Sequence, residues 1–450
     1  MAFDVLVLGG RIYSSTRSEV ADIGIREGII AEIGDLRGKP AAEVVDASGL
    51  AVLPGLIDTQ VHFREPGMEH KEDLASGARA AVLGGVTSVL EMPNTQPPTS
   101  SAEALADKLT RASGRMACNY GFFVGATTDN WPQLPELEWL PGTPGVKMFM
   151  GSSTGTLLVP DDEHVEKVLS HGVGRVAVHS EDHERLESRK NLLSSEPHAR
   201  EHPHLRDAES ARRCTERLLS IAEKTGRPVH VLHVSTQDEL PLLAAARSRG
   251  LRVTCEVTPQ HLWFAAPECY ERLGNLAQMN PPLRAAEHRD ALRMALETGL
   301  FDVIGSDHAP HTLDEKNLPY PQSPSGMPGV QTSLSVLLTL GREMPSLDLH
   351  TVVRLMAENA AALYGMAGKG RVDVGFDADL ALVDPDVEFV VESGWLASKC
   401  GWSPYEGERL RGRTVGVLVH GREVVRESCL VAGAESAGKA IRFHLGAQRP

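Results

Sequence analysis

The most constraining feature of this chain is a repeated alternation of strand-like and helix-like segments through its middle. Short apolar runs such as TSVLEMP (87–93) and VKMFM (146–150) alternate with amphipathic stretches such as DAESARRCTERLLSIAEKTG (207–226). Strand then helix recurs about eight times over roughly 310 residues, a rhythm typical of a parallel (β/α) barrel. The sequence therefore predicts such a barrel over residues 54–365.

The two ends of the chain have a different residue pattern. From Phe3 to about Leu53, and again in 370–385 and 416–425, short β-branched runs are joined by Gly and Asp turn signals. This pattern predicts meanders of short strands. We expect segments 1–53 and 366–450 to form one small, discontinuous domain around the barrel.

Composition narrows the classes of function. The net charge of −15 and the pI of about 5.6 argue against nucleic-acid binding, which favours a basic surface. No apolar run approaches the roughly 20 residues of a membrane span, and the N-terminus lacks a signal-peptide pattern, so we expect a cytoplasmic protein. The six cysteines lack C-x-x-C spacing and are expected to be buried free thiols. An acidic substrate would need a locally positive pocket.

Polar residues gather where the predicted strands end, which is where barrels of this kind carry catalytic groups. Lys147 stands in an otherwise apolar strand. Because burying an unpaired ammonium is costly, we expect it to be solvated or chemically altered. His230 and His233 are three residues apart in one strand, so at most one of them faces a shared site. The other strand-end candidates are His62, His179, Asp307, His308 and His311.

The segment His311–Val330 is rich in Pro and Gly and cannot form a regular helix or a central strand. Long loops in compact barrels are usually functional, so we expect a lid or a substrate-contacting loop rather than a plain surface connection. Glu256 is a candidate for indirect support of the site, and His261 for a structural role. Histidines in polar segments are expected to face solvent: His70, His164, His171, His183, His198, His202 and His204.

Seven motifs, in order along the chain, resemble those of the dihydroorotases in the amidohydrolase superfamily. They are DTQVHFREPG (58–67), EMPNTQPPT (91–99), VKMFMGSSTG (146–155), VHSED (178–182), VLHVST (231–236), NPPLR (280–284) and SDHAPH (306–311). The resemblance implies a (β/α)8 barrel with a small β-sandwich, and a centre of one or two zinc ions at the barrel mouth. The implied reaction is the reversible cyclisation of N-carbamoyl-L-aspartate to L-dihydroorotate in pyrimidine biosynthesis.

The same resemblance implies a role for individual residues. The metal ligands would be His62, Lys147, His179, His233 and Asp307. Lys147 occupies the position of a bridging ligand and is expected to be carboxylated, which would remove its buried charge. Asp307 would also shuttle the proton between water and the leaving nitrogen. The substrate would be held by Arg64, Asn94, Asn280, His311, Ser325 and Gly326.

Gln60 is the main departure from the family pattern, which has a first histidine in D-x-H-x-H at this position. An amide oxygen is a weaker zinc ligand than an imidazole. Three alternatives follow: a single zinc at the intact position, two ions with a weak second position, or an inactive scaffold subunit that holds an aspartate transcarbamoylase. Because the other ligands survive, we favour an active enzyme.

Hydantoinases and allantoinases are the enzymatic alternatives, since they share the fold and cyclic-amide chemistry. They do not resemble this chain in FREPG, MPNT or NPPLR. The planar guanidinium of Arg64 can make two parallel hydrogen bonds to a carboxylate, whereas an uncharged ring has no group that needs its charge. We therefore expect dihydroorotate or N-carbamoyl-L-aspartate as the small-molecule substrate, a homo-oligomeric assembly, and a possible association with a transcarbamoylase.

Overall fold

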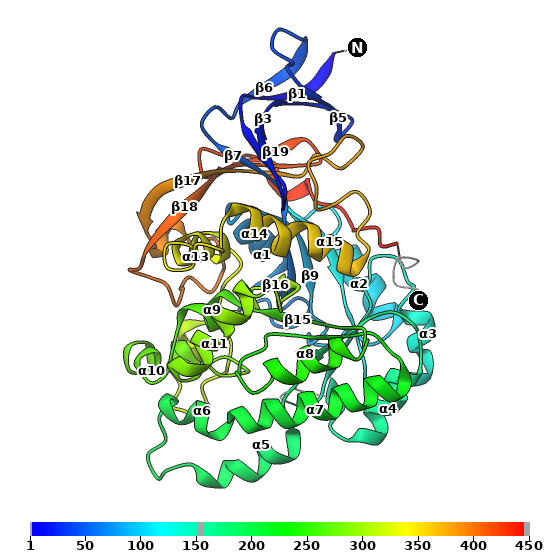
Figure 1. Cartoon of the computed structure of the whole chain (residues 1–450), viewed down its shortest axis with the longest axis vertical. Helices are drawn as coiled ribbons and strands as arrows, with labels where there is room; N and C mark the ends of the chain where they lie inside the picture. The colour runs from blue at the N-terminus through cyan, green and yellow to red at the C-terminus, as the bar shows by residue number, and fades with distance from the viewer. Residues whose placement is uncertain (1, 152–156, 445–450) are drawn as a thin grey trace.

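The computed structural model of the chain describes residues 2–151 and 157–444 and contains the predicted parallel barrel (Figure 1). The strands pair in chain order, and a parallel bridge between Val61 and His308 joins the last strand region to the first. The barrel strands are β8 (Leu56–Val61), β9 (Val86–Glu91), β10 (Asn119–Phe122) continued by β11 (Val124–Gly125), β12 (Val146–Phe149), β13 (Val176–His179), β14 (Val229–Val231), β15 (Val253–Val257) and β16 (Val303–Ile304).

Helices connect these strands, and their ends follow local sequence signals. The longest, α7 (Ala208–Thr225), begins after Asp207, whose side chain accepts a hydrogen bond from Ser210 N, and ends at Gly226 in the left-handed region. Other helices of seven or more residues are α1 (Leu74–Leu83), α2 (Ala102–Ala112), α4 (Asp162–Ser170), α5 (His183–Arg189), α8 (Leu240–Ser248), α11 (Ala286–Glu297) and α13 (Ser333–Leu340). Short helices are α3 (Leu134–Leu137), α6 (His202–Leu205), α9 (Pro259–Trp263), α10 (Glu268–Leu273), α12 (Leu313–Lys316), α14 (Leu349–Val353) and α15 (Asn359–Tyr364).

A second, β-rich unit lies above the barrel in Figure 1 and combines both ends of the chain. One sheet has the order β5-β4-β1-β6, from β1 (Phe3–Leu8), β4 (Asp22–Arg26), β5 (Ile29–Gly34) and β6 (Ala41–Asp46). The other has the order β20-β19-β18-β17-β7-β2-β3, from β2 (Arg11–Tyr13), β3 (Ser18–Val20), β7 (Ala51–Pro54), β17 (Leu380–Val390), β18 (Arg409–Val419), β19 (Arg422–Arg426) and β20 (Cys429–Leu430).

The two chain ends are joined by the antiparallel pairing of β7 with β17, where Pro54 lies opposite Leu380. Apolar side chains from both sheets, such as Ile23 and Leu418, form one buried cluster. The fold class predicted from the sequence is therefore confirmed. The division of the chain at residues 53 and 366 stays a prediction, and residues 370–376 form turns rather than the expected strand.

Two further sequence-based expectations concern the surface and the thiols. Within residues 2–151 and 157–444, no helix combines the length and the apolar character that crossing a membrane requires. Five of the six cysteines are buried as expected, but Cys429 in β20 is exposed, because this short strand lies at the edge of its sheet.

Candidate metal and substrate site

The predicted metal ligands lie in or just after five barrel strands, on the carboxyl edge. His62 follows β8, Lys147 lies in β12, His179 ends β13, His233 follows β14 and Asp307 follows β16. All five side chains are buried. His233 and Asp307 have positive φ angles of 34° and 46°, which are rare for non-glycine residues and are often found where a functional side chain must be aimed.

His62 and Asp307 form the first pair of potential ligands. His62 Nε2 lies 3.2 Å from Asp307 Oδ1, and His62 Nδ1 lies 2.7 Å from Asn94 Oδ1. With the Asn94 amide in this orientation, Nδ1 donates, so the Nε2 lone pair faces a carboxylate oxygen. Burial lowers the pKa of His62 and so disfavours a proton between them. Two facing lone pairs fit a site that a cation would bridge.

His179 and His233 form the second pair. His179 Nδ1 and His233 Nε2 are 3.1 Å apart, close to the roughly 3.3 Å between two nitrogens that share one tetrahedral zinc ion. The other ring nitrogen of His179 donates to Glu181 Oε2 at 2.8 Å, as metal-binding histidines commonly do to a carboxylate. Burial would raise the pKa of Glu181, but the Arg206 charge and the His179 hydrogen bond outweigh it and hold that pKa well below its usual range.

Lys147 is 1% exposed, and its ammonium lies 4.5 Å from the centre of the Phe149 ring. Burial lowers the pKa of Lys147 to about 7, against the opposing charges of Asp307 and Glu256. Within the described part of the chain, no three His, Cys, Asp or Glu side chains are grouped closely enough to hold a metal. The donors form two pairs instead. An ammonium cannot bind a metal, so this set fits a zinc centre only if Lys147 carries a carboxylate.

Glu256 in β15 is fully buried, and its support of the site stays a prediction from the sequence. Its Oε2 accepts a hydrogen bond of 3.0 Å from Thr59 and lies 3.3 Å from His230 Nε2. Burial raises the pKa of Glu256 to about 8. His230 thus faces Glu256 while His233 faces His179, in agreement with the expectation that only one of the two histidines reaches a shared site.

Arg64 is the buried cation of the predicted substrate side. Its Nε donates to Pro310 O at 3.1 Å, and its Nη2 lies 3.2 Å from His311 Nε2. Burial lowers the pKa of Arg64 to about 10. Among residues 2–151 and 157–444, no carboxylate lies within 4.0 Å of this guanidinium. Because burying a charge without a direct counterion is unfavourable, the position suits an anionic ligand.

The loop predicted to contact substrate is held against the same side. His311 Nε2 lies 3.1 Å from Ser325 O. The buried ammonium of Lys316 donates to Gln278 O at 3.3 Å, Pro324 O at 2.8 Å and Gly326 O at 3.1 Å. Apart from the short helix α12, the segment is irregular, as its Pro and Gly content predicts. Lys316 thus fixes the backbone around Ser325 and Gly326.

His202 corrects one prediction from the sequence. It was expected to face solvent, but it is buried, and its Nε2 lies 3.0 Å from both Met279 O and Asn280 Oδ1. Its Nδ1 lies 3.3 Å from the Tyr320 hydroxyl. The polar sequence around α6 conceals this burial, because the contacts come from segments more than 70 residues away. The contacts of Lys316 with three backbone carbonyls also had no signal in the sequence.

The structure therefore brings the predicted residues into two adjoining groups. The first group contains the proposed metal ligands, and the second contains the proposed substrate-binding residues. Their roles in binding stay predictions. Residues 152–155 of the GSSTG stretch lie outside the described part of the chain.

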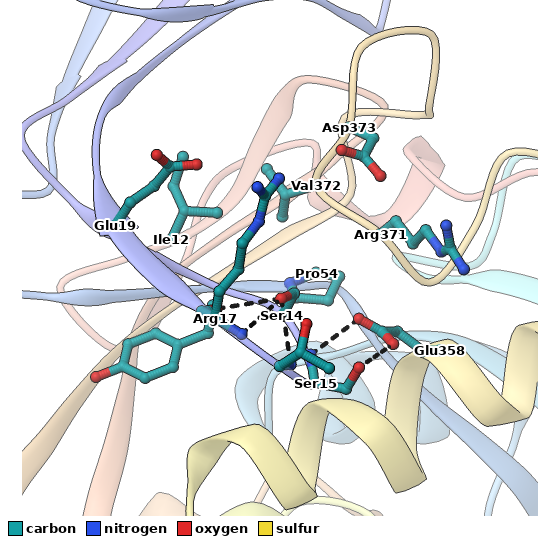
Figure 2. A pocket seen from close by; sticks show the side chains of 12 residues that line it. Ile12, Ser14, Ser15, Arg17, Glu19, Pro54, Glu358, Arg371, Val372 and Asp373 are labelled. Carbon is teal, nitrogen blue, oxygen red and sulfur yellow. Dashed lines mark hydrogen bonds between the residues drawn. The ribbon is translucent and has the colours of Figure 1, made fainter.

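A separate cavity of about 340 Å3, shown in Figure 2, contains none of the predicted site residues. It lies where Ser15, in the turn between β2 and β3, donates hydrogen bonds to Glu358 in the helical segment between α14 and α15.

The fold and the site together define a (β/α)8-barrel enzyme with its polar centre at the carboxyl edge of the strands. More particularly, the chain belongs to the amidohydrolase family, whose sequence model matches residues 51–424. Hydrolysis of a cyclic amide is the activity class that its relatives share.

Three relatives illustrate the range within that class. A dihydroorotase from Methanosarcina mazei is 36% identical over 419 residues, which cover 90% of each chain. An allantoinase from Rubrobacter xylanophilus is also 36% identical, over 454 residues and 98% of each chain. Among solved structures, the L-hydantoinase (dihydropyrimidinase) from Arthrobacter aurescens superposes with a TM-score of 0.92 at 28% identity, covering 98% of this chain and all of that one.

Proposed function

We propose that this protein is a zinc-dependent dihydroorotase that interconverts N-carbamoyl-L-aspartate and L-dihydroorotate in pyrimidine biosynthesis. The observation that carries the proposal is the buried guanidinium of Arg64, which has no carboxylate within ion-pair distance in the described residues. Both proposed substrates bear a carboxylate, the group that a guanidinium binds by two parallel hydrogen bonds. Most of the similar curated proteins also carry the name dihydroorotase.

The residues of the first group supply the reaction chemistry in this proposal. His62, carboxylated Lys147, His179, His233 and Asp307 would hold the zinc, which when bound lowers the pKa of water towards about 7 and polarises a carbonyl. Asp307 takes the proton from the attacking water and returns it to the leaving ring nitrogen. One carboxylate serves both steps because the reverse reaction uses the same groups.

The residues of the second group position the substrate. Arg64 binds the carboxylate. Asn94 contacts the proposed ligand His62, and His311 contacts Arg64, so both lie beside the proposed substrate position. Asn280, held by His202, and the backbone of Ser325 and Gly326 would contact the ring. A buried guanidinium on an acidic protein matches the charge of these substrates.

Allantoin hydrolysis is the second candidate, because the Rubrobacter allantoinase is as similar to this chain as the Methanosarcina dihydroorotase. Hydantoin hydrolysis follows from the structural neighbours. Both substrates have uncharged rings, so neither would use the charge of Arg64. The buried, unmatched guanidinium therefore favours dihydroorotate over both.

The test is to measure kcat/KM of the full-length, zinc-loaded protein on dihydroorotate, N-carbamoyl-L-aspartate, allantoin and hydantoin. We expect dihydroorotate and N-carbamoyl-L-aspartate to be preferred. Replacing Arg64 with Met should cost roughly 1.5–3 kcal/mol of binding, or about 10- to 150-fold in KM, for the charged substrates only. Preference for an uncharged ring would overturn the proposal.

A folded protein with no turnover and tight binding to an aspartate transcarbamoylase would instead identify a scaffold subunit. Size-exclusion chromatography with and without that partner tests the expected homo-oligomer and the expected association. A cytoplasmic location also stays a prediction from the sequence.

A further inference from the structure

Both ring nitrogens of His311 have polar neighbours, and these neighbours determine which nitrogen carries the proton. Nδ1 lies 3.2 Å from Lys71 Nζ, while Nε2 lies 3.1 Å from Ser325 O and 3.2 Å from Arg64 Nη2. The ring is buried. The ammonium of Lys71 also pairs with Glu315 Oε1 at 3.1 Å, which holds it beside the ring.

An ammonium group can only donate hydrogen bonds, so Nδ1 must accept from Lys71. The proton of the neutral ring then sits on Nε2, where it donates to the carbonyl of Ser325. In the opposite tautomer, the Nδ1–H group would face the ammonium of Lys71, and the lone pair of Nε2 would face the carbonyl oxygen of Ser325. Both contacts would be unfavourable. Glu315 Oε2 could not rescue this tautomer, because at 3.7 Å from Nδ1 it is beyond hydrogen-bonding distance.

The doubly protonated ring is also disfavoured. Burial, followed by the neighbouring charges of Arg64, Lys71 and Lys316, lowers the pKa of His311 far below its usual range. Three cations around one imidazole leave the neutral Nε2–H form as the arrangement that satisfies the most contacts.

This tautomer changes what Arg64 can do. If Nε2 carried a lone pair, it would accept from Arg64 Nη2 and occupy one of the guanidinium hydrogens. With a proton on Nε2 that donates to Ser325 O, the ring offers no acceptor to Arg64 Nη2, so this guanidinium hydrogen stays available for a ligand. The guanidinium then keeps its terminal N–H groups for a carboxylate, which accepts two parallel hydrogen bonds.

We propose that Lys71 is a positioning residue that fixes His311 as an Nε2–H donor beside Arg64 and so selects substrates that bear a carboxylate. The part that concerns substrate rests on the proposed dihydroorotase function. In this proposal Lys71 acts on substrate binding through the His311 ring.

The tautomer is measured directly by 15N NMR of the zinc-loaded, full-length protein labelled at histidine nitrogens, with His311→Asn to assign the signal. We expect the Nε2–H pattern in the unmodified protein and in Lys71→Arg, which keeps a donor. Lys71→Met should shift the ring towards Nδ1–H. An Nδ1–H ring in the unmodified protein, or an unchanged ring in Lys71→Met, would overturn the proposal.

Kinetics test the consequence for the substrate. Lys71→Met should raise KM for dihydroorotate about tenfold, the magnitude of one charge-assisted hydrogen bond, with little change in kcat. Turnover of hydantoin should not change, and Lys71→Arg should restore most of the loss. Lys399→Met is the matched control. Lys399 contacts Glu69 and Asp73, which lie in the loop that carries Lys71, but within the described part of the chain it makes no hydrogen bond to His311.

The two proposals fail in different ways. If the unmodified protein does not turn over dihydroorotate, the proposed function fails, and the NMR result still decides the tautomer. If the unmodified protein is active and Lys71→Met keeps both the Nε2–H ring and the original KM, only the Lys71 proposal fails.

Discussion

Gln60 donates a hydrogen bond of 3.1 Å from its side-chain Nε2 to Oδ1 of Asp307. Its Oε1 atom is buried and has no hydrogen-bond partner in the described residues. In this orientation the amide nitrogen, which cannot bind a metal, faces the carboxylate. Gln60 therefore orients Asp307 in the place where the family pattern has a ligand histidine.

Replacing Gln60 with His should increase zinc binding. Because an imidazole is a better zinc ligand than an amide, we expect the bound zinc after equilibrium dialysis to rise from about one towards two ions per chain. Gln60→Ala should keep the zinc content of the unmodified protein but lower kcat, because Asp307 loses its donor. Loss of one zinc ion in Gln60→Ala would show that the amide is a ligand.

Replacing Lys147 should remove the proposed bridging ligand. Lys147→Arg keeps a cation but cannot be carboxylated, so we expect zinc retention and kcat to fall by at least about 100-fold. In Lys147→Ala, added acetate or propionate should restore part of the activity by supplying a carboxylate. With 13C-labelled bicarbonate, a carbamate signal should appear only in the unmodified protein. Equal zinc content in Lys147→Arg would contradict this assignment.

Lys316 should stabilise the loop that ends at Val330. Lys316→Met leaves three carbonyls without their donor, which costs about 1–3 kcal/mol and should lower the thermal midpoint by a few degrees. Limited proteolysis should then cut within residues 317–325. Lys190→Met, at a lysine 63% exposed, is the control and should change stability by less than about 0.5 kcal/mol. Equal protease resistance of the two variants would count against the role of Lys316.

His202 should make the protein less stable in acid. Burial, and then the charge of Arg206, lowers the pKa of His202 to about 3, whereas the unfolded chain has the ordinary value of 6.5. The unfolded state therefore binds an extra proton below pH 6.5, and stability falls as pH falls towards about 3. At about pH 5 the loss reaches about 2 kcal/mol.

His202→Gln should remove this pH dependence, because a neutral amide does not titrate. Denaturant unfolding at about pH 7.5 and pH 5 measures the difference between the two conditions. The exposed His204, two residues away, provides the control His204→Gln, which should keep the dependence of the unmodified protein. Identical pH profiles for the two variants would show that His202 does not carry the effect.

Much of the fold followed from the sequence, and the reason is local. Strands such as β12 are short apolar runs, and helices such as α7 carry their own capping residues, so each element is encoded by its own residues. Once strand and helix alternate, parallel pairing leaves few arrangements, and the carboxyl ends of the strands must share one edge. This is why the sequence alone places His62, His179 and Asp307 at one site.

The sequence by itself thus determined the barrel, the edge that carries the polar centre and the residue types available there. Only the tertiary structure decided how those side chains face one another: Gln60 towards Asp307, His233 rather than His230 towards His179, and His202 inward against Asn280. Such orientations depend on contacts between segments far apart in the chain. Burial, hydrogen-bond partners and tautomers arise from those contacts, so no pattern of neighbouring residues encodes them.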